Sequence, residues 1–90
     1  MENLNNIMFV DRYPSIDLHG YDREGARVAT QDFIRENKKL KNEVFTIVHG
    51  RGSGTVKQAV HDTLRRTKIV REYKTNYYND GCTIVLIDLQ

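Results

Sequence analysis

Two histidines in this sequence each come directly before a glycine, at the end of a short apolar run. They are His19 in the segment IDLHG and His49 in the segment IVHGRGSG. Imidazole changes its charge near neutral pH, so two histidines held side by side can take up one proton and give up another. A lone histidine at the end of a strand is more often structural, but two matching ends favour a catalytic pair.

The segment that follows His49 alternates glycine with polar residues. Glycine lets the backbone approach an anion closely, and the N-terminus of a following helix offers N–H groups and the positive end of its dipole. The segment is not a Walker A motif, and the third glycine of a dinucleotide fingerprint would fall at Thr55. The phosphate of a larger polymer fits better than a bound nucleotide, with these predicted ligands in the loop: Gly50, Arg51, Gly52, Ser53 and Gly54.

Asp17 lies two residues before His19, so on an extended strand both side chains point to the same side. Its carboxylate could orient the imidazole, hold a metal ion or cap the second helix. The third histidine, His61, falls opposite the apolar stripe of its predicted helix and is interpreted as a surface residue. The predicted catalytic residues are therefore Asp17, His19 and His49, and no set of metal ligands is predicted.

Positive charge is concentrated in the middle of the chain. Residues 51–74 include seven Lys and Arg but only two acidic residues. Such an excess is a candidate footprint for a polyanion, with these predicted phosphate ligands beyond the loop: Lys57, Arg65 and Arg66. A solvated helix face is an equal alternative. Tyr77 and Tyr78 follow this stretch, where they could stack on exposed bases or pack against the rim of the sheet.

The first half of the chain is predicted to form a strand, a helix and a second strand. Residues 15–20 are a short strand that ends at a glycine. Residues 22–39 are a helix with Asp22 as its N-cap and with this inner face: Ala26, Ala29, Thr30, Phe33 and Ile34. Residues 43–50 are β-branched and nearly all apolar toward their end, which is typical of a strand inside a sheet.

The second half is predicted to form a helix and a hairpin. Residues 54–66 are a helix with this apolar inner face: Val56, Ala59, Val60 and Leu64. Residues 68–75 are more charged, as an edge strand should be, and residues 82–89 are the most apolar segment. The Asp-Gly pair at residues 80–81 is a hairpin signal.

These elements predict an α/β chain of order βαβαββ, folded as a two-layer α+β sandwich. Each strand–helix–strand unit crosses over right-handed, which puts both helices on one face of a four-stranded mixed sheet. The last strand is the most apolar and needs two neighbours, so the predicted sheet order is 1-2-4-3. His19 and His49 then end neighbouring parallel strands at the carboxyl edge, where open α/β sheets place their ligand sites.

Composition predicts one small globular domain. The 90 residues are 39% hydrophobic and 29% charged. We expect residues 1–14 to form an N-terminal arm and residues 15–90 to form the domain. No apolar run approaches the roughly 18 residues of a membrane span, no signal peptide is evident, and no membrane partner is expected. The single cysteine, Cys82, favours a reducing, cytoplasmic setting.

The two histidine motifs together resemble the Smr domain, the small MutS-related family. The Asp-Leu-His motif of that family falls on residues 17–19 and its His-Gly-x-Gly motif on residues 49–52. Arg51 stands where members commonly have Lys or Arg, and the resemblance covers residues 16–89. The family usually has a glycine-rich segment before the last strand, whereas this chain has only Gly81 there. The family fold is similar to the C-terminal domain of a bacterial translation initiation factor, which agrees with the predicted order.

The resemblance implies a nucleic-acid endonuclease. The family is known for nicking or single-strand cleavage, occurs attached to mismatch-repair-like ATPases or free-standing, and includes members that cleave messenger RNA at stalled ribosomes. For this chain it implies cleavage of single-stranded or distorted RNA or DNA by histidine acid–base catalysis, with RNA favoured and the ribosome as a candidate partner. No cofactor is expected with certainty, and a divalent metal such as Mg²⁺ is left open. The alternative is a non-catalytic module that binds ribosomal RNA or branched DNA.

Overall fold

The computed structural model describes residues 12–52, 54–77 and 79–90. Its elements follow one another in the predicted order βαβαββ, with these bounds: β1 Ser15–Asp17, α1 Arg23–Lys39, β2 Val44–Val48, α2 Thr55–Arg66, β3 Val70–Thr75 and β4 Cys82–Ile87. Of the helices within the described ranges, neither is long and apolar enough to cross a membrane.

Both parallel strands end earlier than the sequence predicts, because glycines turn the chain. The predicted strands run to residues 20 and 50, whereas β1 ends at Asp17 and β2 ends at Val48. Gly20 and Gly50 have φ angles of 82° and 84°, which is the left-handed region that glycine adopts without a steric penalty. Each His-Gly pair therefore forms a turn at the carboxyl end of its strand.

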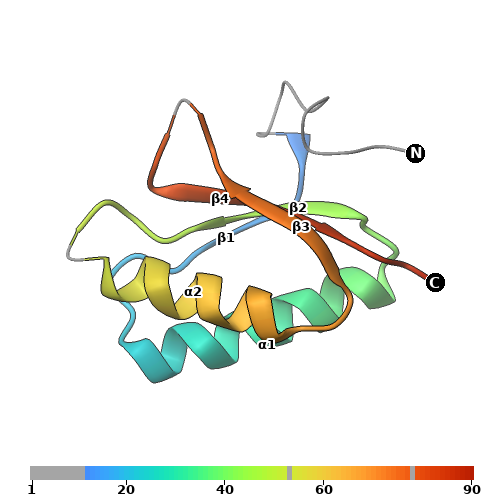
Figure 1. Cartoon of the computed structure of the whole chain (residues 1–90), viewed down its shortest axis with the longest axis horizontal. Coiled ribbons are helices and arrows are strands. Elements are labelled where there is room, and N and C mark those ends of the chain that lie inside the picture. Colours follow the sequence, from blue (N-terminus) through green and yellow to red (C-terminus); the bar gives the residue numbers. More distant parts are fainter. Residues whose placement is uncertain (1–11, 53, 78) are drawn as a thin grey trace.

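The sheet has the predicted strand order, β1-β2-β4-β3. β1 pairs with β2 in parallel, and β4 pairs antiparallel with both β2 and β3. All six residues of β4 are buried, as expected for a central strand. Figure 1 shows both helices on the same face of the sheet, which is the two-layer arrangement that right-handed crossovers predict.

The main core lies between the sheet and the two helices. Alternate residues of β2 and β4 face the helices, and they meet the apolar stripes of α1 and α2 in one buried cluster: Leu18, Ile34, Phe45, Ile47, Val60, Leu64, Val85 and Ile87. The Phe33 ring packs edge-to-face on Phe45, with ring centroids 5.3 Å apart. The predicted inner faces of both helices are confirmed, since their members are buried or packed against this cluster.

The opposite face of the sheet carries a smaller cluster made by Val44, Ile84 and Leu86. Tyr13 packs against this cluster, and the carbonyl of Pro14 accepts a hydrogen bond from the N–H of Thr46 at 2.9 Å. Residues 12–14, which the sequence assigns to an arm, are thus docked on the sheet. The rest of the predicted arm, residues 1–11, lies outside the described part of the chain.

Gly81, at the start of β4, fixes the turn that follows β2. Its carbonyl accepts hydrogen bonds from the N–H groups of both His49 and Gly50, at 2.8 and 3.0 Å. A Cβ atom on Gly81 would lie 3.2 Å from the carbonyl carbon of Gly50 and 3.2 Å from Cγ of Arg51. The β3–β4 hairpin and the loop after β2 therefore approach so closely that a larger residue at this position would push its neighbours aside.

This close approach predicts that Gly81→Ala destabilises the domain. The added methyl group must push backbone and side-chain atoms aside, and such overpacking typically costs about 1–3 kcal/mol. Gly52→Ala is the matched control, because a Cβ atom there meets nothing within 4 Å. Urea unfolding of the two variants measures the difference, and equal free energies of unfolding would show that the hairpin does not press on the loop.

Candidate functional site

A groove of about 520 Å³ lies at the carboxyl edge of β1 and β2, where the sequence predicts a site. It is lined by the turns after both strands and by the first turn of α2, which Figure 1 places at one end of the molecule. The predicted site residues in its walls are His19, His49, Gly50, Arg51, Gly52, Gly54 and Lys57. Ser53, another predicted ligand, lies outside the described residues.

His19 is exposed and is oriented by Asp17. Its ring Nδ1 lies 2.7 Å from Oδ1 of Asp17, and its backbone N–H donates to the same oxygen at 3.1 Å. Because a carboxylate accepts hydrogen bonds, Nδ1 carries the proton and Nε2 keeps its lone pair when the ring is neutral. The bond from the His19 side chain also holds the pKa of Asp17 below its ordinary value of 3.8. Of the three roles left open for Asp17, the geometry supports the orienting one.

His49 is buried, with only 4% of its surface exposed, and both of its ring nitrogens are engaged. Nδ1 lies 3.1 Å from the carbonyl oxygen of Gly50, and Nε2 lies 2.8 Å from Oγ1 of Thr83. Burial lowers the pKa of His49 below 6.5, which favours the neutral ring. The two predicted catalytic histidines therefore border one groove but have opposite environments, one open to solvent and one closed.

His61 is a functional candidate that the sequence analysis missed, and its assignment as a surface residue is wrong. Its Nε2 lies 2.7 Å from Oγ1 of Thr83, and its ring packs edge-to-face on His49 and Tyr73, with centroid distances of 5.8 and 5.1 Å. Two signals point to this position. His61 precedes buried Leu64 by three residues and so shares a side of α2 with it, and Thr83 is a hydroxyl inside an apolar strand that must find a partner.

The two helix N-termini at this edge are not equivalent. α1 is capped by Asp22, whose carboxylate accepts from the N–H of Gly25 at 2.7 Å, as predicted for an N-cap. The N-cap of α2 is Gly54, which has no side chain to accept a hydrogen bond, and within the described residues no carboxylate lies in the first turn of the helix. The positive end of the α2 dipole thus faces the groove.

The predicted basic residues divide into two groups. Arg51 and Lys57 line the groove, and Arg51 also forms an exposed ion pair with Asp80 at 2.8 Å. Arg65 is not part of the groove and pairs with Asp62 at 2.6 Å on the surface of α2. Arg66 lines a different hollow, between the two helices. The structure therefore brings only two of these four cations, Arg51 and Lys57, to the walls of the groove.

Few of the described residues at the groove could bind a metal ion, and the aromatic side chain of Tyr21 lines one wall. Within residues 12–52, 54–77 and 79–90, no three His, Cys, Asp or Glu side chains are grouped to hold a metal ion. Asp17 and Asp80 are each already paired, with His19 and Arg51 respectively. Tyr77 is 90% exposed, and Tyr78 lies outside the described residues.

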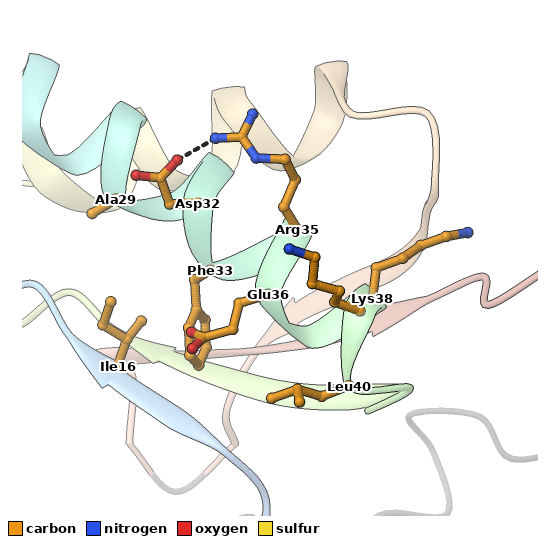
Figure 2. A pocket seen from close by; sticks show the side chains of 9 residues that line it. Ile16, Ala29, Asp32, Phe33, Arg35, Glu36, Lys38 and Leu40 are labelled. Carbon is orange, nitrogen blue, oxygen red and sulfur yellow. Dashed lines mark hydrogen bonds and ion pairs between the residues drawn. The ribbon is translucent and has the colours of Figure 1, made fainter.

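A larger hollow, of about 880 Å³, lies away from the histidines, beside α1 and β1. Figure 2 shows Ile16 on β1, Phe33 pointing from α1 toward the sheet, and Leu40 just beyond the end of the helix. Asp32 and Arg35 form an ion pair on its rim. This hollow has an apolar floor but carries none of the predicted site residues.

Comparison with known proteins agrees with the motifs and with the fold. The family model of the Smr domain matches residues 16–88. Endonuclease MutS2 of Clostridium perfringens is 32% identical over 82 residues, which are 91% of this chain and 10% of that protein. Endonuclease MutS2 of Clostridium botulinum is 36% identical over 73 residues, which are 78% of this chain and 9% of that protein. This chain thus spans about a tenth of the length of these relatives.

Two solved structures have the same fold. The Smr domain of Thermus thermophilus MutS2 superposes with a TM-score of 0.81 at 26% identity, over 83% of this chain and 98% of that one. YdaL, a stand-alone small MutS-related protein from Escherichia coli, superposes with a TM-score of 0.78 at 23% identity, over 83% of this chain and 66% of that one. The family match, the shared fold and the two histidine motifs agree: this chain belongs to the Smr domain family.

Proposed function

We propose that this domain is a nucleic-acid endonuclease in which His19 transfers the proton. The observation that carries the proposal is the Asp17–His19 pair at the groove, with Nδ1 held by the carboxylate and the ring 73% exposed. A carboxylate that fixes the tautomer of an exposed imidazole leaves its other nitrogen oriented to act as a general base. The name of the MutS2 relatives, endonuclease, supports the same reaction class.

The groove also contains the groups that would hold a scissile phosphate. The uncapped N-terminus of α2 offers backbone N–H groups and the positive end of its dipole. Arg51 and Lys57 add two cations to the same walls. Charge that builds on the phosphoryl oxygens in the transition state would be stabilised by these fixed donors, which is the main catalytic contribution a protein makes to phosphoryl transfer.

RNA is the substrate that this chemistry favours. The 2′-hydroxyl of a ribose next to the scissile phosphate is a built-in nucleophile. His19 Nε2 would accept its proton as the 2′-oxygen bonds to phosphorus and the bond from phosphorus to the 5′-oxygen breaks. The leaving oxygen takes a proton from solvent, so the products end in a cyclic phosphate and a 5′-hydroxyl. Messenger RNA on the ribosome would be one source of such a strand.

The first test is cleavage of end-labelled RNA by His19→Ala. Removal of a positioned base typically lowers a rate by about 10²- to 10⁴-fold. We expect that loss for His19→Ala, a smaller loss for Asp17→Asn, and RNA affinity within a few-fold of the wild type for both. Lys39→Ala, an exposed change on α1, is the control and should cleave normally.

The nucleophile and the metal dependence can be identified from the ends of the cleavage products formed with and without a chelator. A 5′-hydroxyl on the downstream product, formed equally in EDTA and in Mg²⁺, fits a 2′-hydroxyl nucleophile. A 5′-phosphate that forms only with Mg²⁺, or cleavage of DNA at the same rate, would show that water is the nucleophile instead of the 2′-hydroxyl. Wild-type activity in His19→Ala would remove His19 from the mechanism.

The second test compares the two groups of cations in binding. Arg51→Glu with Lys57→Glu should weaken binding to all RNA sequences alike, because phosphate contacts carry no sequence information. Each lost contact to a single strand should also lower the slope of log affinity against log salt by about 0.7. Arg65→Glu with Arg66→Glu is matched in charge but lies outside the groove, so it should change affinity less. A larger loss in the Arg65 and Arg66 pair would place the RNA on the helices.

A non-catalytic binding module is the second candidate, and one observation favours it. Because both nitrogens of His49 are engaged inside the protein, only one histidine is free to exchange protons at the groove. A module of this kind would use the α2 N-terminus, Arg51 and Lys57 to hold ribosomal RNA or branched DNA. Tight, salt-dependent binding by wild-type protein that cuts neither RNA nor DNA, with and without Mg²⁺, would identify it.

A further inference from the structure

Three polar side chains meet at the end of the core, directly beneath the loop that follows β2. Thr83 of β4 is fully buried, and its hydroxyl is shared by His49 on one side and by His61 of α2 on the other. The two ring centroids are 5.8 Å apart. Gly81, two residues before Thr83, accepts a hydrogen bond from the backbone N–H of His49. This cluster therefore connects α2, β4 and the glycine loop.

The proton positions in this cluster follow from what each group can donate. The Gly50 carbonyl only accepts, so Nδ1 of His49 carries a proton. In a neutral ring Nε2 of His49 is then an acceptor, and it must receive the single hydroxyl proton of Thr83. With its proton committed to His49, Thr83 can only accept from His61, whose Nε2 must carry a proton. The two histidines are thus fixed in opposite tautomers.

A proton added to His49 would reverse the whole cluster. If His49 became an imidazolium, both of its nitrogens would donate, and Thr83 would have to turn its proton toward His61. His61 would then have to move its own proton from Nε2 to Nδ1. Two imidazolium rings at this separation repel each other, so protonation of one ring disfavours protonation of the other.

We propose that Thr83 and His61 are positioning residues that hold His49 as a neutral Nδ1–H imidazole. In that form His49 donates to the Gly50 carbonyl, and with Gly81 it fixes the shape of the loop that is to bind phosphate. Free histidine favours the Nε2–H form, so the opposite tautomer at His49 needs the donor that Thr83 supplies. The role of this loop in phosphate binding rests on the proposed function, whereas the assignment of the histidine tautomers does not depend on it.

The surroundings of both rings favour the neutral state. Burial is the largest cause that lowers the pKa of each ring. Lys57 lowers both pKa values further, and Arg65 lowers that of His61. The hydrogen bond with the Gly50 carbonyl raises the pKa of His49, and Asp80 raises it less. Asp62 raises the pKa of His61. The Tyr73 ring packs edge-to-face against His61.

These groups predict that the domain loses stability as the pH falls. Because the folded-state pKa of each ring lies below 6.5, the unfolded chain binds protons more readily than the folded chain. The stability is complete above about pH 6.5 and declines as the pH falls from there through the lowered values. The lowered pKa of Asp17 acts in the same direction, but only below its ordinary value of 3.8.

The midpoint of thermal unfolding should therefore be lower at pH 5 than at pH 7.5. His61→Gln keeps an N–H donor for Thr83 but removes one of the two titrating rings, so the drop in midpoint between these pH values should be smaller in this variant. An equal drop in His61→Gln and in the wild type would mean that His61 carries no part of the effect.

The experiment that tests the proposal is ¹⁵N NMR of the histidine rings at pH 7.5, in the wild type and in two Thr83 variants. We expect opposite neutral tautomers in the wild type, Nδ1–H for His49 and Nε2–H for His61. Thr83→Val keeps the shape but removes the hydroxyl, so a mixture of tautomers should form at His49. Thr83→Ser restores the hydroxyl and should restore the wild-type spectrum. The amide spectrum shows that each variant is folded.

Binding of a fluorescently labelled oligouridylate to the same variants supplies the functional readout. Thr83→Val should weaken affinity by about 2- to 10-fold, the equivalent of one lost hydrogen bond, and Thr83→Ser should not. An Nε2–H tautomer or an imidazolium at His49 in the wild type would overturn the proposal, as would a Thr83→Val variant with unchanged tautomers and affinity. If both readouts change as expected in a protein that cuts no substrate, the positioning role stands and the endonuclease proposal fails.

Discussion

The buried imidazole of His49 must satisfy both of its nitrogens, and the carboxyl edge of the sheet is built around that requirement. An unpaired polar atom in such a position costs about 1–3 kcal/mol. Its partners are the Gly50 carbonyl and the Thr83 hydroxyl. The first is available because the chain turns at Gly50 with a φ angle of 84°, and the second because β4 lies next to β2 with Thr83 on the helix side. The hydrogen bonds of the His49 side chain thus depend on both the sheet order and the loop conformation.

The His-Gly dipeptide occurs after two strands, and the position of each strand in the sheet decides whether its histidine is exposed or buried. β1 is an edge strand of three residues, and the histidine that follows it projects into solvent beside a carboxylate. β2 has neighbours on both sides and a helix above it, so the histidine that follows it is enclosed. One ring is free to exchange protons while the other holds the backbone. This division depends on strand position, because both rings have the same intrinsic chemistry.

The order of elements, the sheet order and the inner faces of both helices could be predicted from apolar periodicity and from the rule for right-handed crossovers. The environments of the site residues could not. Periodicity ranks apolar residues, so it left His61 and Tyr73 outside the core although both pack against each other at its end. Counting charges along the chain grouped Arg65 with Arg51, whereas Arg65 lies outside the groove and pairs with Asp62, three residues before it on α2. The capping of α1 by Asp22 was predictable, and it already implied that only α2 could offer an open N-terminus.

The ion pair between Arg51 and Asp80 bears on how such a groove would select its ligand. Both side chains are about 70% exposed, and an exposed pair of this kind is worth at most about 1 kcal/mol. A phosphate that reaches Arg51 can therefore displace Asp80, but Asp80 also repels any anion that approaches. A single small anion gains little from this exchange. A strand that places successive phosphates on the α2 N-terminus, Arg51 and Lys57 gains several contacts for one displacement, so the acidic neighbour favours polymers over free ions.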